Sequence, residues 1–184
     1  MAAARMDTPT ISLLEPLHEW IRPMHPVRHS NSTKDAIASQ LVGVWRLVSY
    51  TDEQEGGEDR FPFGPEPEGF LIYTHDRFVS AQLMKPGRSM FQSNDWHAGT
   101  PEEHMQAGSG YIAYCGVYEV DEQKETVTHT PSVALLPNLI LKGQLRSITL
   151  SGDRLTLCAV GIPVTNGGSS TSRMEWRRDS ACGK

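Results

Sequence analysis

The amino-acid sequence predicts one all-β domain that closes into an antiparallel barrel of eight or nine strands. A chain of 184 residues fits a single domain, and its twelve prolines and sixteen glycines fall in short clusters between short β-rich runs. Short polar turns join most of these runs in simple hairpin order. Because no long helices are present to cover a second face, such a sheet must form a sandwich or a barrel, and hairpin order favours the barrel. Around eight strands leave an interior that holds one small ligand.

The first 35 residues predict an N-terminal extension that is partly helical. Apolar residues with helical spacing form a stripe, namely Leu13, Leu14, Leu17, Trp20 and Ile21. Pro16 limits where this helix starts, and Pro23 and Pro26 end it. We expect the stripe to dock, either on the barrel's own wall or on a second copy of the chain in a homodimer.

A second short helix is predicted immediately before the first strand. Ser32 and Asp35 have capping-box spacing, and the residues from Ala36 to Leu41 suit one or two helical turns that would close one barrel end. The barrel domain is therefore predicted to span residues 36–178, followed by a short tail at 179–184.

Eight β-rich runs follow, or nine if the long run at 139–150 is divided. They are residues 41–51, 69–75, 77–84, 111–121, 125–130, 139–150, 154–162 and 172–178. Of the two long connections, the second contains Thr100 as a helix N-cap, Pro101 at the first helical position and two acids after it. We expect a short helix there, across a barrel mouth.

Composition and motifs argue against several functions. The net charge of −5 includes no basic block, so neither nucleic acid nor an anionic membrane is an expected partner. Three cysteines without metal-like spacing and a start without a signal-like apolar core favour the cytoplasm. Phosphate-loop, dinucleotide, nucleophile-elbow and zinc-helix motifs are lacking, and the histidine pairs lack a third ligand, so no cofactor and no metal site are predicted.

Strand alternation assigns side chains to the barrel interior. The run 111–121 places Ile112, Tyr114 and Tyr118 on its more apolar face, and the run 154–162 places Leu155 and Leu157 there. In the run 172–178, Met174 and Trp176 face inward, and the charged residues Arg173, Glu175 and Arg177 face solvent. An inward tyrosine either donates a hydrogen bond to a substrate carbonyl or packs in the core with its hydroxyl bonded to a neighbour.

Further polar candidates lie on the neighbouring runs. In the run 77–84 two faces compete, and one of them would place Ser80 and Gln82 in the cavity. His129 shares a face with Val127, and Gln144 shares one with Arg146. Facing inward, these groups could polarise a carbonyl and position a proton donor, although a core role is somewhat favoured for His129. Since a buried arginine is costly without a partner, Arg146 either pairs with a carboxylate at the mouth or anchors the substrate.

Several motifs in order resemble a known family. The first strand holds Gly43-x-Trp45, and further motifs follow: Pro62-Phe63-Gly64-Pro65, residues 69–74, 82–84 and 98–103, Tyr114-x-Gly116-x-Tyr118, Val127-Thr128-His129, Pro137-Asn138, Gln144-x-Arg146, residues 153–157 and Glu175-Trp176-Arg177-Arg178. Together they resemble the stand-alone lipocalin-like domain family of bacteria and filamentous fungi.

The resemblance implies an up-and-down barrel with an internal cavity. It also implies that Trp45 packs at the closed end under Arg177 or Arg178, and it adds Asn138 to the expected ligand contacts. Some such barrels act in natural-product pathways as cofactor-free cyclases or isomerases, and others carry or sequester their ligand. Where many relatives have a second histidine after His129, this chain has Thr130 and Pro131.

The leading hypothesis is a cofactor-free cyclisation or isomerisation of a hydrophobic intermediate, pericyclic closure included. His129, Arg146, Tyr114 and Tyr118 are the expected catalytic residues. The expected substrate contacts are Ser80, Gln82, Gln144, Asn138, Ile112, Leu155 and Leu157. The alternative is a non-catalytic carrier with the same apolar cavity, and a third hypothesis is an interaction module that binds a partner through its N-terminal helix.

Overall fold

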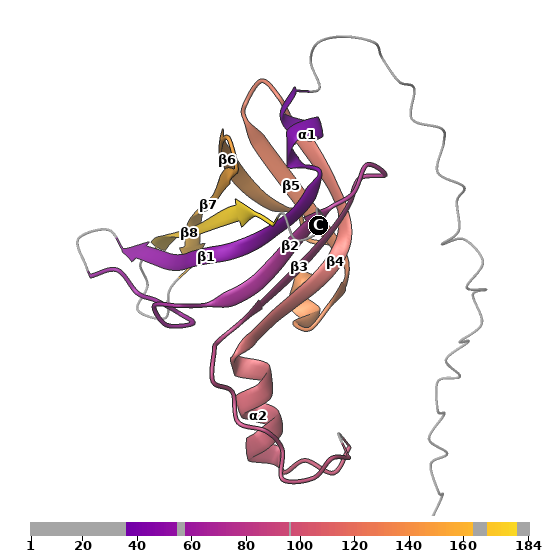
Figure 1. Ribbon diagram of the computed structural model, residues 1–184, viewed down its shortest axis with the longest axis vertical. Coiled ribbons are helices and arrows are strands. Elements are labelled where there is room, and N and C mark those ends of the chain that lie inside the picture. Colours follow the sequence, from indigo (N-terminus) through magenta and orange to yellow (C-terminus); the bar gives the residue numbers. More distant parts are fainter. Residues whose placement is uncertain (1–35, 55–57, 96, 164–168, 180–184) are drawn as a thin grey trace, which may run out of the picture. The chain divides into compact units, whose positions relative to one another are not determined.

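Eight antiparallel strands follow one another around a closed barrel in the order of the sequence (Figure 1). The computed structural model describes residues 36–54, 58–95, 97–163 and 169–179. The strands are β1 Gly43–Gln54, β2 Glu68–Tyr73, β3 Phe78–Met84, β4 Tyr111–Asp121, β5 Thr126–Ala134, β6 Gln144–Ser151, β7 Arg154–Pro163 and β8 Ser169–Arg178. Strand β8 pairs with β1, which closes the sheet. The predicted up-and-down barrel is therefore confirmed.

The bounds of β5 and β6 differ most from the predicted ones. The run 139–150 contributes one strand, because its first residues belong to a 3₁₀ turn, η1 (Pro137–Leu139), and to the loop after it. Strand β5 continues past the expected stop at Pro131. Ser132, the residue after this buried proline, is paired in register with no residue of β4, and this bulge in β5 lets the strand accommodate a residue that has no N–H.

A β-bulge in β1 changes which of its side chains face inward. Trp45 and Leu47 point into the barrel, and the register then shifts between Leu47 and Ser49. Because one extra residue reverses the alternation, Tyr50 pairs with the inward Met174. The bulge thus brings a tyrosine into the barrel that the alternation of the first half of β1 would place outside.

One end of the barrel is closed by helix α1 (Ala36–Leu41) and by Trp45. The indole Nε1–H of Trp45 donates to the carbonyl of Leu41 at 2.8 Å, and the Arg178 guanidinium lies 4.1 Å from the centre of its ring. Arg178 also donates to the carbonyls of Val42 and Gln40. The indole N–H of Trp45 and the guanidinium of Arg178 thus both have hydrogen-bond partners. The sequence left Arg177 and Arg178 as candidates for the residue over Trp45, and it is Arg178.

The glycine of the Gly43-x-Trp45 motif has a steric reason. Gly43 has φ +133°, a conformation that side chains other than glycine rarely adopt. A Cβ at this position would lie 2.7 Å from an Arg178 guanidinium nitrogen. The motif therefore makes room for the arginine that covers Trp45.

Helix α2 (Pro101–Ser109) has the predicted N-cap at Thr100, with a complete capping box to Glu103. It extends from the barrel end opposite α1 (Figure 1), and none of its residues is buried. The helix was expected to lie across a barrel mouth; it projects away from the barrel instead (Figure 1), and none of its residues lines the internal cavity.

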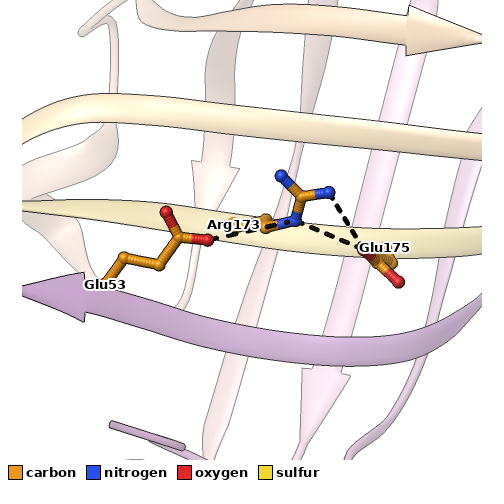
Figure 2. Close-up of polar contacts among 3 residues, drawn as sticks. All are labelled: Glu53, Arg173 and Glu175. Carbon is orange, nitrogen blue, oxygen red and sulfur yellow. Dashed lines mark hydrogen bonds and ion pairs between the residues drawn. The ribbon is translucent and has the colours of Figure 1, made fainter. Parts of the chain in front are cut away.

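The outer wall carries the charges that the alternation of β8 predicts. On β8, Arg173 lies 3.1 Å from the carboxylate of Glu175 and 4.0 Å from that of Glu53 on β1 (Figure 2). All three side chains are partly exposed. The inward side chains of the same strand, Met174 and Trp176, are buried as predicted.

Some predictions concern residues outside the described ranges. They are the helical stripe of the extension 1–35, the Ser32–Asp35 capping box and most of the tail. The domain boundaries at 36 and 178 stay predictions. Helix α1 begins at Ala36. Its first N–H groups, those of Ile37 and Ala38, donate to the carboxylate of Glu122, which comes from a distant part of the chain.

Candidate functional site

A cavity of about 160 Å³ lies inside the barrel, in the half away from α1. Its walls are mainly apolar and come from β1 to β8 and from η1. The lining residues are Tyr50, Leu71, Ala81, Leu83, Ile112, Tyr114, His129, Leu136, Leu139, Gln144, Arg146, Leu157, Ala159, Ser172, Met174 and Trp176. Leu136, just before η1, is exposed, and Leu139 within η1 is partly buried, so these two residues lie at the opening of the cavity.

Six residues predicted for the site line this cavity: Ile112, Tyr114, His129, Gln144, Arg146 and Leu157. They come from β4, β5, β6 and β7, and each lies on the face that alternation assigns to the interior. The structure therefore brings together three of the four expected catalytic side chains.

The fourth, Tyr118, does not line the cavity and lies toward the closed end of the barrel. Its hydroxyl donates to the carbonyl of Thr74 at 3.0 Å, and its ring packs edge-on against Tyr73. Burial raises its pKa, although Arg77 opposes that change. Tyr118 thus takes the core role that the sequence left open for it.

Four expected contact residues also lie away from the cavity, two of them on β3. In β3 the inward face is the one with Val79, Ala81 and Leu83, so Ser80 and Gln82 face outward, because adjacent side chains of a strand point to opposite sides. The Gln82 amide oxygen instead accepts a hydrogen bond from Tyr111 at 2.7 Å.

The other two are Asn138 and Leu155. Asn138 is exposed on η1, and Leu155 is fully buried in the core without lining the cavity. Asn138 was expected from the family resemblance and Leu155 from strand alternation. Neither observation indicates where along the barrel the cavity begins and ends.

His129 is the most buried polar residue of the site, with no exposed surface. Its Nε2 lies 2.7 Å from the hydroxyl of Tyr73, and its Nδ1 lies 2.8 Å from the hydroxyl of Tyr114. Burial lowers the pKa of His129 to about 3, and the positive charge of Arg146 acts in the same direction. At neutral pH the imidazole is therefore uncharged, with one nitrogen donating and the other accepting.

Two phenols beside the site, those of Tyr73 and Tyr50, stay protonated. Burial raises the pKa of Tyr73 well above its ordinary value, and it also raises that of Tyr50, where the nearby Asp52 adds to the effect. Both hydroxyls therefore remain hydrogen-bond donors. Tyr73 was not predicted from the sequence, although it follows β2 alternation, and Tyr50 could not be placed inside without knowledge of the bulge.

Arg146 is half-buried on the cavity wall and forms no ion pair with any carboxylate of the described ranges. Arg173 on the outer wall, by contrast, is held by two glutamates (Figure 2). Of the two roles predicted for Arg146, pairing with a carboxylate is therefore not observed within the described part of the chain. A guanidinium that faces an apolar cavity without a counter-charge is available to an acceptor on a ligand.

Trp176 lines the cavity, but its indole N–H is buried away from any accessible surface and is unpaired within the described residues. Trp176 is 2% exposed, and within the described residues its Nε1 has no hydrogen-bond partner. The other buried polar atoms without partners, Asp52 Oδ1 and Ser170 Oγ, belong to residues that do not line the cavity. Sequence alternation predicted that Trp176 faces inward but could not reveal that its N–H lacks a partner.

Neither a metal centre nor a membrane-spanning helix is found in the part of the chain that the structure describes. No three histidine, cysteine, aspartate or glutamate side chains there come together in a way that could hold a metal ion. None of the helices there has the length and apolar character that crossing a bilayer requires.

A closed eight-stranded barrel with a mostly apolar internal cavity defines a lipocalin-like ligand-binding protein. A family model described as "Lipocalin-like domain" matches residues 42–179. The chain belongs to this lipocalin-like domain family.

A curated relative from Aspergillus oryzae (strain ATCC 42149 / RIB 40) is named "4'-hydroxy-3'-methoxypropiophenone carrier protein ppsC". It is 32% identical over 106 residues, which cover 54% of this chain and 96% of that relative. The resemblance predicted from the sequence motifs is confirmed by these matches.

Proposed function

We propose that this protein binds one small aromatic molecule inside the barrel and carries it chemically unchanged. The observation that carries this proposal is the mostly apolar cavity of about 160 Å³ enclosed by the strands. Apolar walls favour a hydrophobic ligand because its transfer from water releases about 25 cal/mol per Å² of buried surface. The few polar groups on the wall would fix the orientation of the ligand.

The volume of the cavity favours a compact ligand. An apolar protein cavity of about 150 Å³ accepts benzene, so a single aromatic ring with short substituents suits this barrel better than an extended polyene. The compound in the name of the A. oryzae relative, a propiophenone with hydroxyl and methoxy groups, is of that kind.

Carriage is favoured over catalysis by the state of His129. Efficient general bases have a pKa near the working pH, whereas the pKa of His129 is about 3. Both of its ring nitrogens are also engaged by tyrosine hydroxyls. The relative's name, a carrier protein, points the same way.

Catalysis of a cofactor-free cyclisation or isomerisation is the second candidate, and one observation favours it. Tyr114 and Arg146 both line the cavity, and Arg146 has no counter-charge within the described residues. Such groups stabilise negative charge that develops on a carbonyl oxygen, without needing a base. This route uses the cavity as a template that restrains the substrate.

Titration calorimetry with 4'-hydroxy-3'-methoxypropiophenone, followed by chromatography and mass spectrometry of the recovered compound, tests the proposal. We expect one molecule bound per chain and quantitative recovery of the same compound. Recovery of an isomer of equal mass but different retention would favour the second candidate instead.

A pair of matched variants on β4 shows whether binding occurs inside the barrel. Ile112 lines the cavity, and Val117 is 37% exposed on the outer face of the same strand. Ile112→Trp should abolish binding by filling the cavity, and Val117→Trp should leave it unchanged. Equal affinities for both variants would place the compound outside the barrel and refute the proposal.

A further inference from the structure

Arg146 is the one charged side chain among the described residues that line the cavity, since that lining includes no acidic residue and His129 is neutral at neutral pH. Within the described part of the chain Arg146 forms no ion pair and no hydrogen bond, and its nitrogens are not among the buried atoms without partners. The guanidinium therefore keeps surface that a molecule in the cavity can reach.

The position of Arg146 on β6 turns its charge toward the barrel interior. Ile148, the next inward residue of β6, is buried and does not line the cavity, so Arg146 lies where the cavity meets the core. Burial sets the direction of the pKa shifts of Tyr50, Tyr73 and His129, and the positive charge of Arg146 acts on all three as well. These side chains come from β1, β2 and β5, so the guanidinium faces the space that they surround.

Asp52 on β1 is the acidic side chain that acts on a residue of the cavity wall, and it does not neutralise Arg146. After burial, it is the next cause of the raised pKa of Tyr50. Asp52 itself does not line the cavity, and the cation that acts on it is Arg60. The charge of Arg146 is thus left without a counter-charge among the described residues.

The other titratable groups that face the cavity leave its positive charge in place. Tyr50 stays a protonated phenol, His129 is a neutral imidazole, and the hydroxyl of Tyr114 is hydrogen-bonded to His129. A charge in such a partly buried site attracts an opposite charge about four times more strongly than in bulk water. An anionic oxygen would also accept charge-assisted hydrogen bonds from the guanidinium, which are stronger than those to a neutral oxygen.

We infer that the cavity binds an aromatic compound as its oxyanion, with the negative charge held by the Arg146 guanidinium. A phenol with a carbonyl group across the ring is the simplest neutral compound that yields such an anion, because its two oxygens share the charge. The phenol proton passes to solvent, since His129, with a pKa of about 3, does not accept it. The inference rests on the proposed binding function and adds the charge of the ligand and the residue that selects it.

Two effects on the bound phenol oppose each other, and the sign of their sum is measurable. The cation stabilises the phenolate and lowers the pKa of the phenol, whereas the apolar walls disfavour the charged form and raise that pKa. With Arg146 present we expect the first effect to prevail, and without Arg146 only the second remains.

The test is a spectroscopic titration of bound 4'-hydroxy-3'-methoxypropiophenone, whose phenol and phenolate forms absorb at different wavelengths. With protein in excess, the absorbance is followed over the pH range in which the protein stays folded, and the free compound is titrated in the same buffers. The proteins are the wild type, Arg146→Gln, Arg146→Lys and Arg173→Gln. Arg173 is the matched control, because its guanidinium pairs with Glu175 on the outer wall and does not line the cavity (Figure 2).

In the wild type and in Arg173→Gln, the bound phenol should titrate about one to two pH units below the free compound, so that the anion binds about tenfold to a hundredfold more tightly than the neutral form. In Arg146→Gln the bound phenol should titrate above the free compound. Arg146→Lys keeps the cation but not the planar fork, so its shift should be downward and smaller.

The outcomes separate this inference from the function on which it rests. If the wild type binds the compound but the bound phenol titrates at or above the free one, carriage stands and the anionic site is refuted. Equal shifts in the wild type and Arg146→Gln would refute the role of Arg146. Should Arg146→Gln fail to fold, the direction of the wild-type shift and its reduction in Arg146→Lys decide the matter. If calorimetry detects no binding of the compound to the wild type, the proposed function and the inference both fall.

Discussion

Two buried tryptophans at different depths of the barrel show how the same residue type serves two purposes. Trp45 at the closed end donates its N–H to Leu41 and lies under Arg178. Trp176 is similarly buried, but within the described residues its N–H has no partner, and its ring lines the cavity. A satisfied polar group stabilises the fold, whereas an unsatisfied buried one costs stability. Burial alone does not separate the two.

His129 lies between these two regions and connects them. One ring nitrogen bonds to Tyr73, which packs against Tyr118 at the closed end, and the other bonds to Tyr114 on the cavity wall. The histidine thus holds a tyrosine of the cavity wall in place through a hydrogen bond that is itself anchored to the core. Single substitutions in either region can therefore test the contrast between them.

The largest effect is expected at the closed end. Trp45→Ala should lower the free energy of unfolding by about 3–5 kcal/mol, because a buried aromatic is lost and Arg178 loses the ring beneath it. Denaturant unfolding measures the change. An unchanged transition midpoint would mean that Trp45 does not hold this end together.

Acid should act through His129. The pKa of about 3 in the folded protein lies below the unfolded value of 6.5, so between those values the unfolded state binds more protons. Stability from this group is complete above pH 6.5 and falls on acidification by about 1.4 kcal/mol per pH unit until pH 3. Between pH 7 and pH 5 the wild type should lose about 2 kcal/mol more than His129→Gln, as measured by urea unfolding at both pH values. If the two proteins lost the same stability between these pH values, the pKa of His129 would not be lowered in the folded state.

A smaller loss is expected at the start of α1. Glu122→Ala removes the carboxylate that accepts from the N–H groups of Ile37 and Ala38 and should cost about 1 kcal/mol, like other lost N-terminal caps. Glu119, which is exposed on β4, is the control. Replacing Glu119 with alanine should change the free energy of unfolding by less than about 0.5 kcal/mol, and a similar cost for both variants would argue against a capping role.

The smallest change in stability is expected for Trp176→Phe. Loss of some packing is offset by removal of an unpaired donor, so the free energy of unfolding should change by less than about 1 kcal/mol. Thermal and urea unfolding of the ligand-free protein are the measurements. A loss as large as that of Trp45→Ala would show that the Trp176 N–H has a structural partner after all and would remove the contrast between the two tryptophans.

Much of the barrel is readable from the sequence because strand alternation and turn chemistry are local. The inward faces of β4, β7 and β8 follow the two-residue period, so the pattern alone assigns Tyr114, Leu157 and Trp176 to the interior, where they are buried. The Thr100 capping box is local in the same way.

The fold class, the order of the strands and the inward side chains of β4, β7 and β8 follow from the sequence, whereas the pattern of β3 leaves two faces open. Contacts between distant strands, by contrast, are needed to show that Tyr50 enters the cavity, because a β-bulge reverses the period without a local mark. The same holds for the finding that Tyr118 is satisfied in the core and Trp176 is not. Whether a buried polar group finds a partner depends on atoms brought by distant strands, and that information is absent from any one strand.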